Sequence, residues 1–222
     1  EAVSLTSEIS SIGQRASALQ ADLLDENQVA GLVYKARTAL GGPLSILVNN
    51  ASIFELDTIE TATRKSWDRH IESNLRAPFV MTQEFAQQAP DAEVDSNGEK
   101  ISRSLIVNLL DQRVRKLTPE FSSYSIAKMG LWALTKISAQ GLAPKIRVNA
   151  IGPGPTLQGS RQSSYHFRLQ RSNTILHRGA DVSDINAALG YFMDARAVTG
   201  QLLCVDGGQH LSWQTPDVLG VE

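Results

Sequence analysis

Short apolar runs alternate with longer amphipathic segments along this chain, and that alternation limits the possible folds more than any other feature. The expected strands are Leu44–Val48, Leu105–Leu110, Ile146–Ile151 and Gln201–Val205. The segments expected to be helical are Asp25–Ala39, Trp67–Gln88, Ser122–Leu142 and Ser183–Asp194. Strands separated by helices of this length form βαβ units with parallel strands. We therefore predict an α/β fold with a doubly wound parallel sheet, helices on both faces and a single domain over residues 1–222.

The composition excludes several classes of function. Of 222 residues 42% are hydrophobic and the formal net charge is −2, so nothing favours a nucleic acid or an anionic membrane as partner. The sequence has no run of 18 apolar residues and no signal-like start, so we expect a cytoplasmic protein without a membrane partner. The single cysteine, Cys204, excludes a disulfide within the chain, and with four scattered histidines it predicts no metal site.

Two loops of small residues follow expected strands. Asn49-Asn50-Ala51-Ser52 comes after the first of these strands, and Gly152-Pro153-Gly154-Pro155-Thr156 comes after the third. Open α/β sheets bind ligands at the carboxyl ends of their strands, and glycine lets a backbone approach a ligand closely. Each loop alone is equally compatible with a tight turn that binds nothing.

Tyr124 and Lys128 are four residues apart in the expected helix Ser122–Leu142. Residues at this spacing lie on one helix face, with Cβ atoms ~5–6 Å apart. An ammonium ~4 Å from the phenol favours its ionised form by up to ~4 kcal/mol at an effective dielectric of about 20. The spacing therefore predicts that the pKa of Tyr124 falls from about 10 towards neutrality, which suits an acid–base catalyst. The alternative is an incidental pair on a surface helix.

Five motifs resemble, in order and spacing, those of the short-chain dehydrogenases/reductases. They are Asn49-Asn-Ala51, Asn74–Phe79, Tyr124-xxx-Lys128, Arg147–Gly154 and Asp206-Gly-Gly208. Within that family the chain is most similar to pteridine reductases, which carry an aspartate thirteen residues before the tyrosine, as Asp111 does here. Asn49–Phe54 and Gly152–Thr156 also match their pattern. The resemblance spans nearly the whole chain and implies a Rossmann-type NAD(P)-binding domain.

The resemblance also implies roles for individual residues. The implied catalytic residues are Asn74, Asp111, Tyr124 and Lys128. The implied cofactor-binding residues are Asp22, Leu23, Asn50, Ala51, Ser52, Tyr124, Lys128, Gly152, Pro153, Gly154 and Thr156. The implied substrate-binding residues are Phe54, Asp111, Tyr124 and Gly154, with the Phe54 ring stacked on a pterin. Tyr124 would donate the proton, Lys128 would bind the nicotinamide ribose, and Asn74 would hold a relay water.

Asp111 stands where most members of the family carry a serine. A serine hydroxyl donates a hydrogen bond to a substrate carbonyl, whereas an ionised carboxylate repels a developing alkoxide and raises the pKa of Tyr124. A ring C=N bond is a better substrate, because hydride goes to carbon and the nitrogen then takes a proton. We expect Asp111 and Tyr124 to share that proton and to titrate as a pair. The alternative is that Asp111 caps a turn and points away.

Two further segments follow from the resemblance. Residues 157–180 correspond to a substrate lid, with solvated charges as the equal alternative. Glu1–Ile12 resembles the helix before the family's third strand, which would be Ala16–Ala21. The preceding strand, glycine-rich turn and helix, ~30 residues, have no match, so we expect the natural chain to be longer. That turn would carry the pyrophosphate site and distinguish NADPH from NADH.

The leading hypothesis is a reductase of a pterin or folate-like small molecule. The implied cofactor is NADPH, with NADH not excluded. A second hypothesis is a general carbonyl or hydroxyl oxidoreductase of the same family, and a third is a catalytically weak NAD(P)-binding regulatory member. The family likeness implies a homotetramer, with Trp67–Gln88 and Ser122–Leu142 as interfaces. The particular substrate and the direction of reaction stay open.

Overall fold

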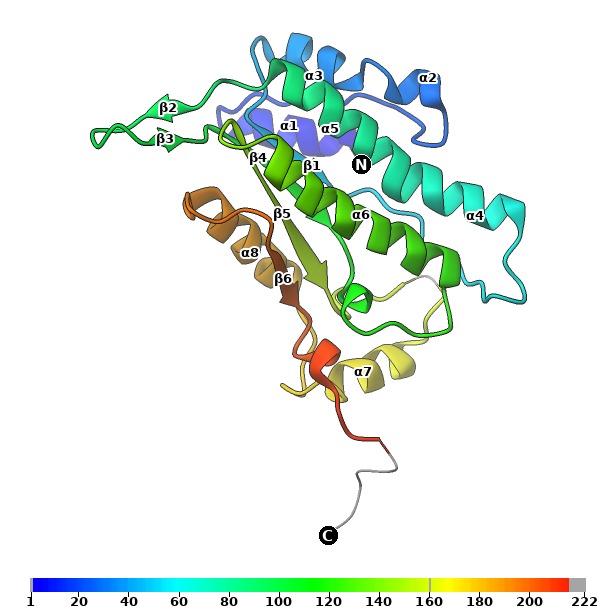
Figure 1. Cartoon of the computed structure of the whole chain (residues 1–222). Coiled ribbons are helices and arrows are strands. Elements are labelled where there is room, and N and C mark those ends of the chain that lie inside the picture. Colours follow the sequence, from blue (N-terminus) through cyan, green and yellow to red (C-terminus); the bar gives the residue numbers. More distant parts are fainter. Residues whose placement is uncertain (1, 160, 216–222) are drawn as a thin grey trace.

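The computed structural model describes residues 2–159 and 161–215, and Figure 1 shows their arrangement. The helices are α1 Ala2–Ser11, α2 Glu26–Val29, α3 Leu32–Leu40, α4 Arg64–Ile71, α5 Ala77–Gln88, α6 Ser122–Gly141, α7 Ser164–Ser172 and α8 Val182–Asp194. The strands are β1 Ile46–Asn49, β2 Glu93–Val94, β3 Lys100–Ile101, β4 Ser104–Leu109, β5 Ile146–Pro153 and β6 Leu202–Val205. No helix of these residues is long and apolar enough to cross a membrane.

Four strands form one parallel sheet in the order β1-β4-β5-β6. The register aligns Val48 with Val107 across β1 and β4. It aligns Ala150 of β5 with Asn108 of β4 on one side and with Leu202 of β6 on the other. In Figure 1 helices α5 and α6 cover one face of this sheet and α8 covers the other, which confirms the predicted doubly wound Rossmann-type fold.

Strand β4 lies at the centre of the core because every one of its residues is buried. Leu105, Val107 and Leu109 point to one face and pack with Phe192 of α8. Ile106 points to the other face and packs in the cluster that contains Phe85 of α5. Successive side chains of a strand point to opposite faces, so an uninterrupted apolar run is what a strand covered on both faces requires.

The predicted helix Asp25–Ala39 is wrong as a single element. It is broken between α2 and α3, where Gly31 takes a left-handed conformation with φ 75°. The carboxylate of Glu84 in α5 accepts hydrogen bonds from the backbone N–H of Gly31 (2.6 Å) and of Val33 (3.3 Å). This carboxylate satisfies the free N–H groups at the start of α3, which the local sequence could not reveal.

The predicted helix Trp67–Gln88 begins earlier and changes geometry inside. Thr63 caps its start in a reciprocal box with Ser66, so α4 begins at Arg64. Between α4 and α5 lies a π-helical turn, Glu72–Arg76, which contains Asn74. Such turns occur as single insertions in α-helices, frequently at functional sites.

Two further elements differ from the predictions. The first strand starts at Ile46 rather than Leu44, because the Gln88 side chain takes both backbone hydrogen bonds of Leu44. Residues 16–21 form no strand, since no other described strand pairs with them; the expectation of a longer natural chain stays a prediction. Between α5 and β4, Glu93–Val94 and Lys100–Ile101 pair as the small antiparallel hairpin β2–β3.

Candidate active site

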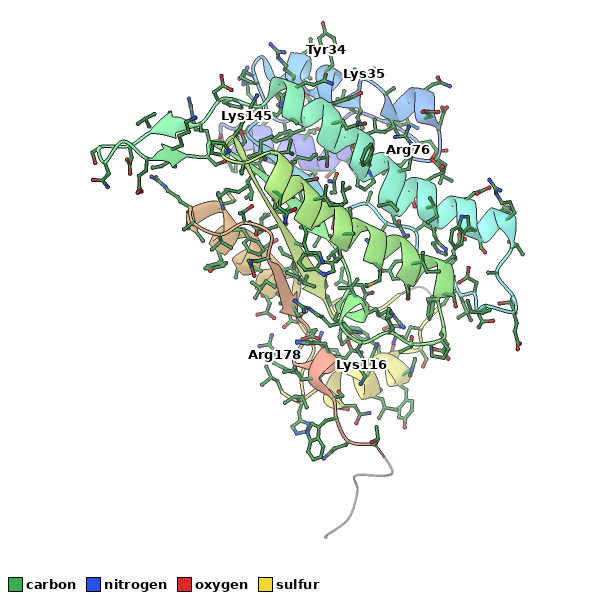
Figure 2. The ribbon with its side chains drawn as sticks, in the orientation of Figure 1. Tyr34, Lys35, Arg76, Lys116, Lys145 and Arg178 are labelled. Carbon is green, nitrogen blue, oxygen red and sulfur yellow. The ribbon has the colours of Figure 1, made fainter. Side chains whose placement is uncertain are left out.

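A cavity of about 690 Å³ lies beyond the carboxyl ends of the sheet strands. Its walls include Ser52 and Phe54 after β1, Asp111 after β4, and Pro153 with Gly154 at the end of β5. In Figure 2 the labelled Lys116 and Arg178 lie at this end of the molecule, near α7, whereas Lys145 lies towards the other end. The sheet therefore brings sequence-predicted residues from three separate strands to one cavity.

Each carboxylate oxygen of Asp111 accepts a hydrogen bond from a different partner. Its Oδ1 accepts a hydrogen bond from the Arg113 backbone N–H (2.8 Å) and so caps the short 3₁₀ turn Gln112–Val114. Its Oδ2 accepts a hydrogen bond from the Tyr124 hydroxyl (3.0 Å). Asp111 thus caps a turn, but it does not point away from Tyr124 as the alternative from the sequence required. The cap fixes the carboxylate in the orientation that reaches the phenol.

The predicted fall in the pKa of Tyr124 is wrong for this structure. Burial raises the pKa of Tyr124 well above 10, and the charge of Asp111 and its hydrogen bond raise it further. Arg113 and the Ser52 hydroxyl lower it by less. The expectation gave the attraction of Lys128 more weight than the burial of the ring and the opposing charge of Asp111, and in the structure burial and Asp111 dominate. Tyr124 is therefore a protonated donor over the whole physiological range.

Lys128 is buried one helical turn from Tyr124. Its ammonium lies 5.7 Å from the centre of the Tyr124 ring and donates a hydrogen bond to the Leu109 carbonyl (2.8 Å) at the end of β4. Burial lowers the pKa of Lys128 to about 8, against the opposing attraction of Asp111. An ammonium carries three donors, and the described residues engage one of them, so two are left for a ligand.

Asn74 is fully buried and its side-chain amide is already bonded. It accepts hydrogen bonds from the Ile53 backbone N–H (2.8 Å) and the Ser73 hydroxyl (2.8 Å), and it donates to the Ile53 carbonyl (2.8 Å). The amide therefore holds the loop that carries Ser52 and Phe54. A relay water at Asn74 would have to bind its backbone, in the π-helical turn, and that role stays a prediction.

The predicted cofactor residues divide into exposed and structural groups. Asp22, Asn50, Ala51 and Ser52 are exposed, while Leu23 and Thr156 are half-buried. In the loop after β5, a Cβ on Gly154 would lie 2.6 Å from the Cβ of Asp206, so glycine is needed there to pack against the loop after β6. The close approach inferred for Gly154 is thus first of all to Asp206. Cofactor binding by any of these residues stays a prediction.

Aromatic rings line the cavity beside Asp111. Phe54 stacks on Phe121 with ring centres 4.2 Å apart and an interplanar angle of 11°. Its ring centre also lies 4.7 Å from that of Tyr124, in a T-shaped arrangement. The guanidinium of Arg113 lies 4.9 Å from the Phe121 ring centre. The sequence reasoning missed Gln112, Arg113 and Phe121. Their positions directly after Asp111 and before the Tyr124 helix were the available signal. Stacking of Phe54 on a substrate stays a prediction.

A buried hydrogen-bond chain ties the Phe54 loop to the start of α6. His70 Nε2 accepts from the Glu55 backbone N–H (3.1 Å), so the proton of the neutral ring sits on Nδ1 and is donated to the Ser123 hydroxyl (2.7 Å). Ser123 in turn donates to the Asp57 carboxylate, which also accepts from the Ser123 backbone N–H (3.1 Å). The chain requires a neutral His70, because a proton on Nε2 would face the donor of Glu55.

This chain predicts a pH-dependent loss of stability. Burial lowers the pKa of His70, against the charges of Asp57 and Glu55. Unfolded chains take up the histidine proton near pH 6.5, but the folded protein does so only at lower pH. The free energy of unfolding should therefore fall as the pH drops below about 6.5.

Urea unfolding at several pH values tests this. The free energy of unfolding of His70→Gln should not fall in this way. The exposed-histidine control His166→Gln should keep it, and a wild-type slope in His70→Gln would exclude His70 as the cause.

The predicted lid segment 157–180 contains α7, and its Gln162, His166 and Gln170 line the cavity. Arg171 anchors the end of α7 by donating to the carbonyls of Pro155 (2.8 Å) and Ala180 (2.6 Å). The segment thus covers the cavity and is tied down at its carboxyl end. Movement of this segment as a lid stays a prediction.

Comparison with known proteins assigns the family. A family model described as "Enoyl-(Acyl carrier protein) reductase" matches residues 2–210. The chain is a short-chain dehydrogenase/reductase. It is 38% identical over 203 residues to the probable galactose dehydrogenase GalD of Rhizobium meliloti, covering 88% of this chain and 75% of the relative. It is 30% identical to a cyclopentanol dehydrogenase of Comamonas testosteroni, covering 90% and 79%.

Among solved structures, this short-chain dehydrogenase/reductase is similar to FolM alternative dihydrofolate reductase 1 from Brucella canis, crystallised with NADP. The identity is 40% and the TM-score 0.88, with 98% of this chain and 82% of that chain covered. The resemblance inferred from the five motifs is therefore confirmed at the level of the family, together with its oxidoreductase class. The FolM structure also confirms the likeness to an NADP-binding reductase of the folate type.

Residues at and near this cavity fit part of a dinucleotide: Ser52 and Thr156 line it, whereas Lys128 and Asn50 lie outside its lining. The two unengaged donors of Lys128 suit ribose hydroxyls, and the exposed backbone of Asn50–Ser52 lies open after β1. One part of the predicted motif is structural instead. The buried Asn49 donates to Asn108 (2.8 Å), which donates to Thr135 of α6 (2.9 Å). Asn49 therefore ties the sheet to α6.

Proposed function

We propose that this protein uses NADPH to reduce a pterin or folate-like substrate at a ring C=N bond, with Asp111 and Tyr124 supplying the proton. The observation that carries the proposal is the hydrogen bond from the Tyr124 hydroxyl to Asp111 Oδ2 (3.0 Å) beside the cavity. The similarity to a dihydrofolate reductase crystallised with NADP supports it independently.

The hydrogen-bonding character of the pair selects the substrate. A ketone offers only acceptors, and beside a carboxylate its oxygen would have no donor, because the Tyr124 proton points to Asp111. A pterin ring carries N–H donors that a carboxylate accepts. Reduction places one electron pair and one hydrogen on carbon and leaves a strongly basic nitrogen. A phenol of raised pKa still protonates such a nitrogen, since the proton moves to the stronger base.

The cofactor would supply the hydride. Lys128 would hold the nicotinamide ribose with its two remaining donors, and Asn50–Ser52 and Thr156 would lie along the dinucleotide. Asn74 would keep the Phe54 loop in place through Ile53, so that the aromatic rings confine a flat heterocycle. Each of these is a binding or positioning role, whereas the proton comes from the Asp111/Tyr124 pair.

A second candidate is a carbonyl or hydroxyl oxidoreductase. The similarity to a probable galactose dehydrogenase and a cyclopentanol dehydrogenase favours it, because these names describe oxidation of hydroxyl groups. In that case Asp111 would have to accept a hydrogen bond from a substrate hydroxyl. A regulatory member that binds NADPH without turnover is the third possibility.

An NADPH oxidation assay separates these candidates. We expect the purified protein to oxidise NADPH with dihydrobiopterin or dihydrofolate at a kcat/KM at least ~100-fold above that with a panel of ketones, the scale of a positioned proton donor. Turnover of ketones alone would select the second candidate. NADPH binding without any turnover would select the third.

We also propose a homotetramer that uses α4–α5 and α6 as interfaces. These helices expose large apolar side chains, among them Trp67 (40%), Phe79 (40%) and Ile137 (64%). Where exposed apolar side chains form one contiguous patch, the patch marks a protein–protein interface, and this is the arrangement that the proposal requires of α4, α5 and α6.

A further inference from the structure

Two arginine side chains line the cavity beside its aromatic rings. Among the lysines and arginines of the described chain, Arg113 and Arg161 are the ones that border this space. Arg113 lies in the 3₁₀ turn after β4, whereas Arg161 lies far along the chain, in the segment 157–180. The fold thus brings two positive charges from separate segments to one ligand space.

The charged ends of these side chains, and not only their stems, lie at the cavity. The Cζ atoms of Arg113 and Arg161 lie 5.8 Å and 6.0 Å from the ring centre of Phe54, which itself lines the cavity. Arg161 also donates a hydrogen bond to the Phe54 carbonyl, and Arg113 donates one to the Thr118 hydroxyl (2.6 Å). Both guanidinium groups are therefore held beside the same ring.

Neither guanidinium forms an ion pair with a carboxylate of the described residues. The arginines that do so are Arg64, Arg69, Arg76, Arg103, Arg171 and Arg178. Two carboxylates line the same cavity, but Asp111 accepts hydrogen bonds from the Arg113 backbone and Tyr124, and Glu120 pairs with no described cation.

This arrangement favours a bound anion. Each guanidinium has five N–H donors, and the described residues engage one donor of Arg113 and one of Arg161. Two like charges beside one ring repel each other, and an anion between them reverses that repulsion. The planar donor pairs of a guanidinium match the oxygens of a carboxylate or a phosphate.

The positions of the two arginines indicate which part of a ligand they meet. Arg113 is half-buried and lies two residues from Asp111, whereas Arg161 is exposed. The cavity volume of about 690 Å³ lies within the ~300–1,000 Å³ of sites that hold drug-sized ligands. With a heterocycle at the Asp111/Tyr124 pair, a substituent of that heterocycle would extend past Arg113 towards Arg161 and the solvent.

We propose that Arg113 and Arg161 bind an anionic group, a carboxylate or a phosphate, on the tail of the reduced heterocycle. The protein then prefers dihydropteridines with such a tail over those with an uncharged one. This inference rests on the proposed function and deepens it, because it names the class of substrate. The two arginines are specificity residues, and the proton transfer stays with the Asp111/Tyr124 pair.

The test compares three substrates in steady-state kinetics with saturating NADPH. Dihydrofolate carries a tail with carboxylates, dihydroneopterin phosphate carries a phosphate, and dihydrobiopterin has an uncharged tail. In Arg113→Gln/Arg161→Gln the KM for an anionic substrate should rise at least ~10-fold more than the KM for dihydrobiopterin, the scale of one charge-assisted hydrogen bond. The anionic substrate with the larger rise identifies the tail as a carboxylate or a phosphate.

Arg168→Gln is the matched control, because it removes an exposed arginine of α7 that does not line the cavity. It should keep the wild-type ratio of the KM values. A measurement on the wild type makes the test independent of how well the double variant folds. Raising NaCl from about 0.05 M to about 0.5 M should raise the KM for the anionic substrate far more than that for dihydrobiopterin, since salt screens exposed charges.

Three results would overturn the role of the arginines. They are an equal change in KM for all three substrates in the double variant, a wild-type KM for both anionic substrates that does not respond to salt, and a loss of NADPH affinity alone. The last result would assign the arginines to the phosphates of the cofactor. A wild-type protein that turns over none of the three substrates would instead overturn the proposed function itself.

Discussion

Replacing Asp111 with serine should lower kcat/KM for a dihydropteridine by ~10²–10⁴-fold, the range of a positioned acid–base group. Serine is the informative substitution because its hydroxyl can also cap the 3₁₀ turn at Arg113, so the local backbone should survive. What disappears is the carboxylate that accepts the Tyr124 proton. Steady-state kinetics with NADPH and dihydrobiopterin measure the effect.

The same substitution should change the pH profile in a defined direction. Asp111 raises the pKa of Tyr124, so its removal lowers that pKa and moves the alkaline limb of kcat/KM to lower pH. Turnover of ketones should stay level or rise, because a serine can donate to a carbonyl. Asp68→Ser removes an exposed carboxylate of α4 and should leave both substrates unaffected. Undiminished dihydropteridine turnover in Asp111→Ser would remove Asp111 from the proton transfer.

The two members of the pair should not act additively. Once Asp111→Ser has removed the partner of the phenol, Tyr124→Phe should add little, because both changes disable one proton-transfer unit.

Replacing Lys128 with methionine should abolish tight NADPH binding while making the protein more stable. The loss of charge-assisted hydrogen bonds should weaken the Kd for NADPH by roughly 10- to 150-fold. The free energy of unfolding, in contrast, should increase. The pKa of Lys128 falls to about 8 in the folded protein, so at neutral pH folding includes the burial of an ammonium that the unfolded chain keeps in water.

The pH dependence of stability follows from the pKa of Lys128 in the folded protein and in the unfolded chain. Between about pH 8 and about pH 10.5 the unfolded chain holds a proton that the folded protein has released, so the wild-type unfolding free energy rises with pH there. Lys128→Met should lack that rise and be more stable at pH 7 by about 1–3 kcal/mol.

Denaturant titrations at pH 7 and pH 10 measure the change in stability, and NADPH titrations measure the change in affinity. Lys136→Met, at an exposed position of α6, is the control. Unchanged NADPH affinity in Lys128→Met would contradict the proposed ribose contact.

Much of the fold was predictable because its core elements are locally periodic. The β4 run reads as a buried strand and the α6 segment reads as a helix without any knowledge of their partners. The boundaries that were missed depend on distant side chains. The Gln88 side chain hydrogen-bonds to the backbone of Leu44, and the Glu84 carboxylate accepts hydrogen bonds from N–H groups at the start of α3. Neither contact leaves a signal near the boundary that it sets.

The site was predictable in its members but not in its electrostatics. The thirteen-residue spacing placed Asp111 and Tyr124 together, because a strand end and the first turn of the following helix meet at one edge of the sheet. The pKa of Tyr124 was predicted in the wrong direction, since it depends on burial, which sequence spacing does not contain.

The most direct test of the account traces the hydride. The wild-type protein is given NADPH deuterated at the transferring position of the nicotinamide, together with equal concentrations of a dihydropteridine and a ketone. We predict that the deuterium is found by NMR on the ring carbon next to the newly protonated nitrogen of the reduced pteridine. Deuterium found only in the alcohol product, with the dihydropteridine unchanged, would contradict the assignment of Asp111 and Tyr124 to the reduction of a ring C=N bond.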